Sequence, residues 1–214
     1  MLLVASCGEE GRPGPGPETP SAPPSPSRAT PVPTATPVPT ATSRTTTQTV
    51  HVRYTVDIRI DDQDGFRDLL AQAMADPRGW VRAGFVVTEH DDAPYTVVLA
   101  EGDVVDELCE PYDTGGEVSC QNGSVVAINA ERWRDGVDHW PDDLKSYRTM
   151  LLNHEMGHLL GQHHRPCPRT GALAPVMQQQ TGSLDGCRAN AWPLDEEVER
   201  AARHDLKLAP AYGE

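Results

Sequence analysis

Strict alternation of apolar and polar residues marks the first segment of the chain that has a clear structural period. Between residues 50 and 60 every second position is apolar: Val50, Val52, Tyr54, Val56, Ile58 and Ile60. The positions between them are polar, and a period of two places the apolar set on one face of an extended strand. The segment is therefore predicted to be a β-strand with one buried face.

A helical period follows this strand. Asp64 is placed to cap a helix, and Asp76 with Pro77 should end it, because proline disfavours helical backbone in the residue before it. The apolar positions between these signals recur at helical spacing: Phe66, Leu69, Leu70, Ala73 and Met74. One face of this helix is therefore predicted to pack on the core.

Three more strands are predicted from short apolar runs at residues 84–88, 95–100 and 124–129. The stretch 102–123 between the last two is predicted to be rich in loops. Asn122 and Gly123 close it with a dipeptide typical of tight hairpin turns. The strand that follows is thus expected to pair with the residues just before the turn.

A long helix is predicted to open at Pro141 and Asp142 and to run to about Leu160. Its residues near one face include Leu144, Tyr147, Met150, Leu151 and His154. A second helix is predicted at residues 195–206, with Val198, Ala201, Ala202 and Leu206 facing inward. The order strand, helix, several strands and long helix indicates an α+β domain, in which a twisted mixed sheet packs against helices.

The folded domain is predicted to span residues 48–214, because the chain before it has a different composition. Eleven of the 20 prolines precede residue 48, and the hexapeptide Ala-Thr-Pro-Val-Pro-Thr occurs at residues 29–34 and again at 35–40. Proline removes backbone donors, and the low apolar content cannot offset the entropy of ordering. Residues 8–47 are predicted to be a disordered tether that spaces the domain from a membrane or wall. A tail without a spacing role is the alternative.

Residues 1–7 resemble the end of a bacterial lipoprotein signal, because small residues precede a cysteine in Val4-Ala5-Ser6-Cys7. The segment lacks a positively charged start and a full-length apolar stretch. We interpret it as a truncated signal in which Cys7 is a lipidation candidate and does not pair. A chance resemblance is the alternative.

Four further cysteines lie in the predicted domain: Cys109, Cys120, Cys167 and Cys187. An even number favours two disulfides and an oxidising compartment, with four buried thiols as the alternative. Three pairings are possible, and sequence order favours the first with the second and the third with the fourth. The sequence contains no run of 18 apolar residues, so no transmembrane helix is predicted. The chain is therefore expected to be exported, as a secreted protein or a cell-surface lipoprotein.

The charge of the chain limits its partners. The formal net charge is -14, and the only lysines are Lys145 and Lys207. Nucleic acids and anionic lipid surfaces attract basic faces, so neither is expected to bind. Membrane contact is expected only through a lipid anchor at Cys7, and the protein is expected to be a monomer.

The strongest chemical signal is the string His-Glu-Met-Gly-His-Leu-Leu-Gly-Gln-His-His at residues 154–164. His154 and His158 are four residues apart, so a helix places both imidazoles on one face. Gly161 can adopt positive φ and end the helix, which allows His164 to approach the same ion. Three neutral imidazoles leave one zinc position open for water, and Glu155 is placed beside the ion as the catalytic base.

Other assignments of these side chains remain open. His163 competes with His164 as the third ligand, although the register favours His164. Cys167 could instead close the shell as a thiolate, which would make the site structural. The histidines could also simply pack or face water on an amphipathic helix. We predict one Zn²⁺ per chain, held by the two helical histidines and His164.

The string matches the zinc signature of the metzincin metallopeptidases, which the chain therefore resembles over roughly residues 49–190. Members of that superfamily have a tight turn after the zinc helix, with a methionine beneath the metal. Pro175-Val176-Met177-Gln178 follows the third histidine here, so the resemblance implies that Met177 is that methionine. It also implies a twisted mixed sheet against a long zinc-binding helix.

The chain is similar, more narrowly, to an uncharacterised family of exported, actinobacterial-type metzincin-like domains. The residues that carry this similarity are Arg78-Gly79-Trp80, Tyr147-Arg148, the run Ala-Pro-Val-Met-Gln-Gln-Gln-Thr at 174–181, and Gly186-Cys187 with Asn190, Trp192 and Pro193. Some metzincins have a tyrosine shortly after the methionine turn, whereas the next one here is Tyr212. The segment between His164 and Met177 is short, which predicts a small or shallow substrate pocket on the primed side of the scissile bond.

These patterns predict an extracellular zinc metallopeptidase that hydrolyses peptide bonds with zinc-activated water and Glu155 as general base. The expected substrate is a peptide or protein, with cell-wall material as one candidate. The alternative is a non-catalytic zinc-containing binding module at the cell surface, for which the histidines alone would suffice. A zinc-scavenging lipoprotein is a third hypothesis, although such proteins usually have longer histidine-rich tracts.

Overall fold

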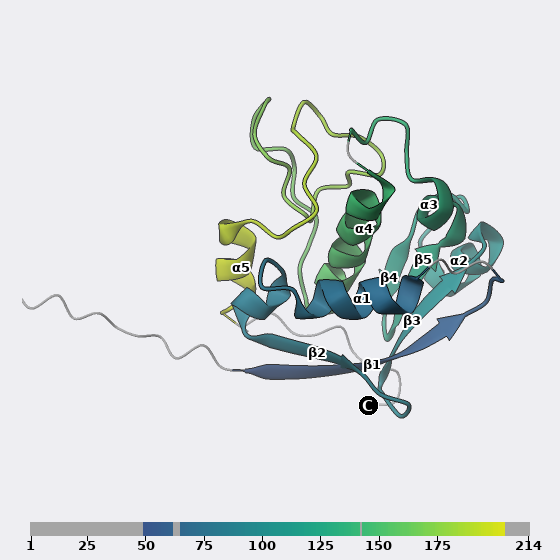
Figure 1. Ribbon diagram of the computed structural model, residues 1–214. Coiled ribbons are helices and arrows are strands. Elements are labelled where there is room, and N and C mark those ends of the chain that lie inside the picture. The colour runs from purple at the N-terminus through teal and green to yellow at the C-terminus, as the bar shows by residue number, and fades with distance from the viewer. Residues whose placement is uncertain (1–48, 62–64, 142, 204–214) are drawn as a thin grey trace, which may run out of the picture. The chain divides into compact units, whose positions relative to one another are not determined.

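Five strands of the described chain form one mixed sheet in the order β2-β1-β3-β5-β4 (Figure 1). The computed structural model describes residues 49–61, 65–141 and 143–203. The strands are β1 (Val50–Ile58), β2 (Phe85–Glu89), β3 (Tyr95–Ala100), β4 (Cys120–Asn122) and β5 (Val125–Asn129). Neighbouring strands are parallel except for β4, which runs antiparallel to β5 at one edge of the sheet.

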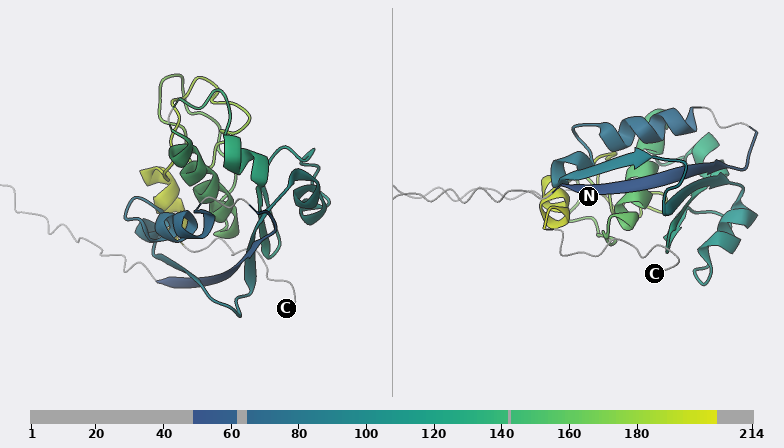
Figure 2. Two further views of the ribbon diagram at one scale, coloured as in Figure 1. Left: turned by 45° about the vertical axis from the view of Figure 1, so that its right-hand side comes forward. Right: turned by 90° about the horizontal axis from the view of Figure 1, so that it is seen from below.

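Helices lie on both faces of this sheet (Figures 1 and 2). The main core lies on one face, where α1 (Phe66–Ala75) and α4 (Leu144–Leu159) pack against it. On the other face, α2 (Gly102–Cys109) packs on β4 and β5. The short helices are η1 (Trp80–Ala83), α3 (Ala130–Asp135) and α5 (Asp195–Ala201). The predicted α+β fold with a mixed sheet is confirmed.

The alternation that predicted the first strand is visible in its burial. Val52 and Tyr54 are buried, whereas His51 and Arg53 between them are exposed. The central strand β3 is buried on both faces: Val97 belongs to the main core, and its neighbour Val98 belongs to the smaller cluster under α2. A strand with helices on both faces needs such a continuous apolar run.

Several predicted boundaries were wrong. The stretch 102–123, predicted to be rich in loops, begins with the unpredicted helix α2, whose apolar residues Val105 and Cys109 form a buried stripe. The long helix begins at Leu144 and not at Pro141, because the side chain of Asp143 accepts a hydrogen bond from Ser146 N at 2.7 Å and caps it there. The last helix ends at Ala201.

Some predictions fall on residues outside the described ones. These are the signal-like segment 1–7 with Cys7, the tether 8–47, the helix cap Asp64, and Asp142 and Leu206 of the two later helices.

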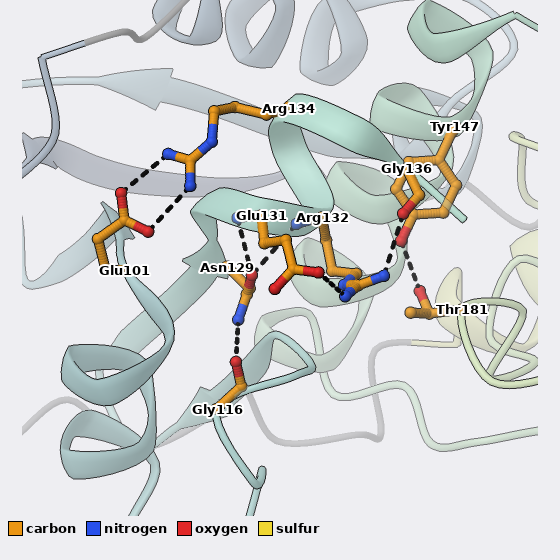
Figure 3. Close-up of polar contacts among 9 residues, drawn as sticks. All are labelled: Glu101, Gly116, Asn129, Glu131, Arg132, Arg134, Gly136, Tyr147 and Thr181. Atoms are coloured by element: carbon orange, nitrogen blue, oxygen red, sulfur yellow. Dashed lines mark hydrogen bonds and ion pairs between the residues drawn. The ribbon is translucent and has the colours of Figure 1, made fainter. Parts of the chain in front are cut away.

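Helix α3 was not predicted, and its start depends on one buried side chain. Asn129 ends β5, and its side-chain oxygen accepts hydrogen bonds from Glu131 N and Arg132 N (Figure 3). Its side-chain nitrogen donates to Gly116 O at 2.8 Å. The same residue thus caps α3 and fastens the loop before β4, which forms one wall of the cleft described below.

The described cysteines form two disulfides, Cys109–Cys120 and Cys167–Cys187, which is the pairing that sequence order favours. The alternative of four buried thiols was wrong. Both bridges are consistent with an exported protein, because disulfides persist in oxidising compartments. No helix in the described part of the chain is long and apolar enough to cross a membrane.

Candidate metal centre

Helix α4 supplies two histidines and the acidic residue of the candidate site. His154 and Glu155 are 7 % and 5 % exposed, and His158 is half-buried one turn further along. Four residues of helix advance the chain by about one turn, so both imidazoles project from the same face. The buried position of α4 therefore holds these side chains on a rigid element.

The chain reverses after α4 at a glycine that a side chain would strain. Gly161 has a φ of 81°, and it donates to His158 O at 2.9 Å while Gln162 N donates to Gly157 O at 2.9 Å. This pair of bonds is the Schellman motif, which ends helices at a left-handed glycine. The bend returns the chain toward the helix, and it places His164 beside the other two histidines, as the sequence predicts.

The three imidazoles converge. Nε2 of His158 lies 3.2 Å from Nε2 of His154 and 3.0 Å from Nε2 of His164. One nitrogen from each ring lies within 4.8 Å of the other two, the spacing of a group that could hold one metal ion. His163 is exposed and outside this cluster, and Cys167 is bonded to Cys187. Cys167 is therefore not a thiolate ligand.

Backbone carbonyls fix the tautomers of the two helical histidines. Nδ1 of His154 lies 2.8 Å from Val176 O, and Nδ1 of His158 lies 2.9 Å from Gln162 O. A carbonyl only accepts, so both Nδ1 atoms carry the proton and the lone pairs are on Nε2. Those lone pairs face each other, which is unfavourable unless a cation lies between them. The donor set and its carbonyl partners therefore fit a metal ion bound by histidine.

Burial keeps these rings neutral. It lowers the pKa of His154 to about 3 and that of His158 to about 4, and it also lowers the pKa of His164. Neutral imidazole is the form that binds a metal. Burial raises the pKa of Glu155 to about 8. A cation bound by the adjacent histidines would favour the ionised carboxylate again, because opposite charges nearby lower a carboxyl pKa.

Met177 lies beneath α4, packed against the turn between the two helical histidines. It is 1 % exposed and lies within a tight turn, in which Gln178 N donates to Pro175 O at 3.0 Å. A Cβ added to Gly157 would lie only 2.5 Å from Met177 Sδ. The sulfur thus occupies the space that the missing side chain of this glycine leaves.

Gly157→Ala is expected to lower the free energy of unfolding by about 1–3 kcal/mol, because its methyl group would overlap Met177 Sδ and lie 2.9 Å from Trp80 Cζ2. The better helix propensity of alanine offsets about 1 kcal/mol of this cost. Urea unfolding of the full chain measures the change. Gly182→Ala is the matched control, because its Cβ would have no neighbour nearer than Gln179 O at 3.6 Å. Equal stability of the two variants would contradict the packing described here.

A cleft with a volume of about 750 Å³ opens over the histidines. One wall is formed by β4 and the loop before it, from Tyr112–Thr114 and Val118–Gln121, and the other by Gln179–Ser183 with Asp185. His154, Glu155, His158 and His164 line the cleft between these walls. The site is therefore accessible to a ligand much larger than water.

The wall after the methionine turn is held by buried hydrogen bonds. Gln180 is fully buried, and its side chain donates to Asn190 O at 2.9 Å and accepts from Asn190 N at 3.0 Å. The hydroxyl of Tyr147 on α4 lies 3.0 Å from that of Thr181 (Figure 3). These two contacts fix the wall of the cleft in place.

The Cys167–Cys187 bridge closes the loop that contains this wall and the methionine turn. Replacing both cysteines by serine is expected to lower the free energy of unfolding by about 3 kcal/mol. The bridge spans 20 residues and reduces the conformational entropy of the unfolded chain. Urea unfolding of the double variant beside the wild type measures this. An unchanged midpoint would show that the bridge does not form in the protein.

Sequence reasoning found the converging residues but missed their supports. Val176 O and Gln162 O carry no side-chain signal, because any residue offers a carbonyl. The carboxylate of Glu197 on α5, which accepts from Val176 N and Met177 N, was also missed. Glu197 lies about twenty residues from Val176 and Met177 in the sequence, and no local periodicity predicts a contact over that separation.

Comparison with known proteins gives a family. A family described as protein of unknown function (DUF3152) matches residues 20–206. No curated protein matches the chain. Because the match covers most of the sequence, the chain belongs to the DUF3152 family.

Proposed function

We propose that this protein is an exported zinc-dependent metallopeptidase of the metzincin type. The observation that carries the proposal is the convergence of three Nε2 atoms beside the buried Glu155 at the floor of an open cleft. A mixed sheet with an antiparallel edge strand, the long helix α4 and the turn at Met177 support the metzincin assignment.

His154, His158 and His164 would hold the zinc ion. When bound, the ion supplies a Lewis acid that polarises a scissile carbonyl and makes a water molecule a stronger nucleophile. Glu155 accepts a proton from the attacking water and delivers it to the leaving amine nitrogen, so one water is consumed and one peptide bond breaks. The carbonyl partners at Val176 and Gln162 keep the Nε2 atoms directed at the ion.

The edge strand β4 supports an extended peptide as the substrate. Among the described strands, β4 lies at the end of the sheet and pairs with β5 alone, and it contributes Cys120 and Gln121 to the cleft wall. The outer edge of a strand offers backbone donors and acceptors to an added strand. A peptide bound along β4 would therefore lie across the cleft, over the histidines.

Catalysis is favoured over a binding module by the position of Glu155. Three histidines suffice to bind zinc. Burying a carboxyl group next to them costs free energy, because its charged form loses its hydration, and the raised pKa of Glu155 reflects this cost. Such a cost is typical of a group with a chemical role. Export is supported by the two disulfides, and a lipid anchor at Cys7 is part of the proposal.

The proposal is tested on the full chain loaded with zinc. Metal analysis is expected to give one zinc per chain, and mass spectrometry is expected to detect cleavage in a library of unstructured peptides. A chelator should abolish cleavage, and added zinc should restore it. One zinc per chain without cleavage of any peptide or cell-wall fragment would favour the binding module instead.

A further inference from the structure

Glu197 lies outside the histidine string, and its buried carboxylate binds the methionine turn. The same turn contacts His154 of the candidate metal centre. Glu197, in the first turn of α5, is 4 % exposed. Its Oε1 accepts from Met177 N at 2.9 Å, and its Oε2 accepts from Val176 N at 3.0 Å and from Leu194 N at 2.8 Å. The bond to Leu194 caps its own helix, but the other two reach a segment twenty residues away in the sequence.

One peptide group connects this carboxylate to a metal ligand. The peptide between Val176 and Met177 donates its N–H to Glu197, and its carbonyl accepts from Nδ1 of His154 at 2.8 Å. A trans peptide directs its N–H and C=O to opposite sides. The carboxylate, the peptide and the imidazole therefore form one chain of hydrogen bonds, with the acid at one end and the ring at the other.

Such a chain has two physical effects on the ring. It fixes the orientation of the carbonyl, and with it the tautomer and the direction of Nε2 of His154. It also makes the carbonyl oxygen a stronger acceptor, because a charge at one end of a hydrogen-bonded chain polarises its members. A carboxylate bonded directly to a metal-binding histidine has the same effect on ligand basicity.

We propose that Glu197 is a positioning residue for the metal centre, which acts on His154 through the Val176–Met177 peptide. The inference rests on the proposed metal binding, but the bonding it describes exists in the metal-free protein as well. Glu197 does not touch a substrate or the ion, so its effect must be seen in the ligand and in metal affinity.

The test compares Glu197→Gln with Glu199→Gln in the full chain. Both changes remove one negative charge from α5, but Glu199 is exposed. Glutamine has one acceptor oxygen, and its NH₂ group cannot accept from a backbone N–H, so the bonds to Val176, Met177 and Leu194 cannot all persist. Glu197→Gln is expected to weaken zinc binding by about 10- to 100-fold in competition with a chelator, and Glu199→Gln to leave it unchanged.

A second measurement needs no metal. In the metal-free protein, the Nδ1 proton of His154 should give a slowly exchanging, low-field NMR signal in the wild type and in Glu199→Gln. In Glu197→Gln the signal should shift upfield or be lost to faster exchange. Failure of the wild type to bind zinc would refute the proposed metal centre, whereas an unchanged proton signal in Glu197→Gln would refute the role of Glu197.

If Glu197→Gln does not fold, Glu197→Asp replaces it. This variant keeps the charge but shortens the side chain by one methylene, so its carboxylate cannot meet all three donors. It is expected to weaken zinc binding relative to Glu199→Asp. Zinc affinity and a His154 proton signal equal to those of the wild type would overturn the proposal.

Discussion

Replacing Glu155 by glutamine is expected to lower the rate of peptide hydrolysis by about 10²- to 10⁴-fold while the protein keeps its zinc. Glutamine has nearly the same shape, but it cannot accept the proton of the attacking water or return it to the leaving amine. The three histidines of the cluster are unchanged, so metal binding should persist. Initial rates on a cleaved library peptide, together with metal analysis, measure both quantities in one preparation.

The stability of the metal-free variant is the control for this experiment. Burial raises the pKa of Glu155, so ionising this group in the folded protein costs free energy. The neutral amide avoids that cost, and Glu155→Gln should therefore not lower the melting temperature of the metal-free protein. A rate within a few-fold of the wild type would exclude Glu155 as the base. Loss of zinc would instead make Glu155 part of the ligand set.

The parts of the site that lie within one local element could be predicted from the sequence. Helical spacing determines where His154 and His158 project, and a glycine at 161 is the residue that a left-handed turn prefers. The alternation in β1 similarly determined which side chains are buried. In each case the needed information lies within one short segment of the sequence.

Contacts between distant segments could not be predicted in this way. The carboxylate of Glu197 reaches the Val176–Met177 peptide only because α5 packs beside the methionine turn, and no local pattern encodes that approach. Helix α2 was missed for a related reason. Its stripe of Val105 and Cys109 is short, and it is recognisable only once β3 and β5 are seen beneath it.

The cleft walls also combine features that the sequence predicted with contacts that it did not. Cysteine order indicated which pairs are bridged, but not that Cys120 would lie in the edge strand β4 that lines the cleft. The segment at 174–181 predicted a methionine turn, but not that the Thr181 hydroxyl would lie at hydrogen-bonding distance from that of Tyr147 on α4. The residues of the cleft walls come together only through contacts between segments that are distant in the sequence.

His158→Ala is expected to weaken zinc binding by at least about 100-fold, because even the outer partners of metal-binding histidines contribute roughly 10- to 100-fold. His158 is the central member of the cluster, with its Nε2 3.2 Å from that of His154 and 3.0 Å from that of His164. Its removal leaves two ligands whose nitrogens no longer share a near neighbour. Competition with a chelator of known affinity gives the change directly.

The neighbouring His163→Ala is the matched control, because it removes an exposed imidazole that lines the cleft but lies outside the cluster. Zinc that binds only the folded state raises the melting temperature in proportion to the logarithm of its concentration over Kd. This rise should persist in His163→Ala and nearly vanish in His158→Ala. If His163→Ala lost the rise while His164→Ala kept it, the third ligand would be His163. If His158→Ala kept one tightly bound zinc, the three-histidine centre itself would be wrong, and the peptidase proposal would fail with it.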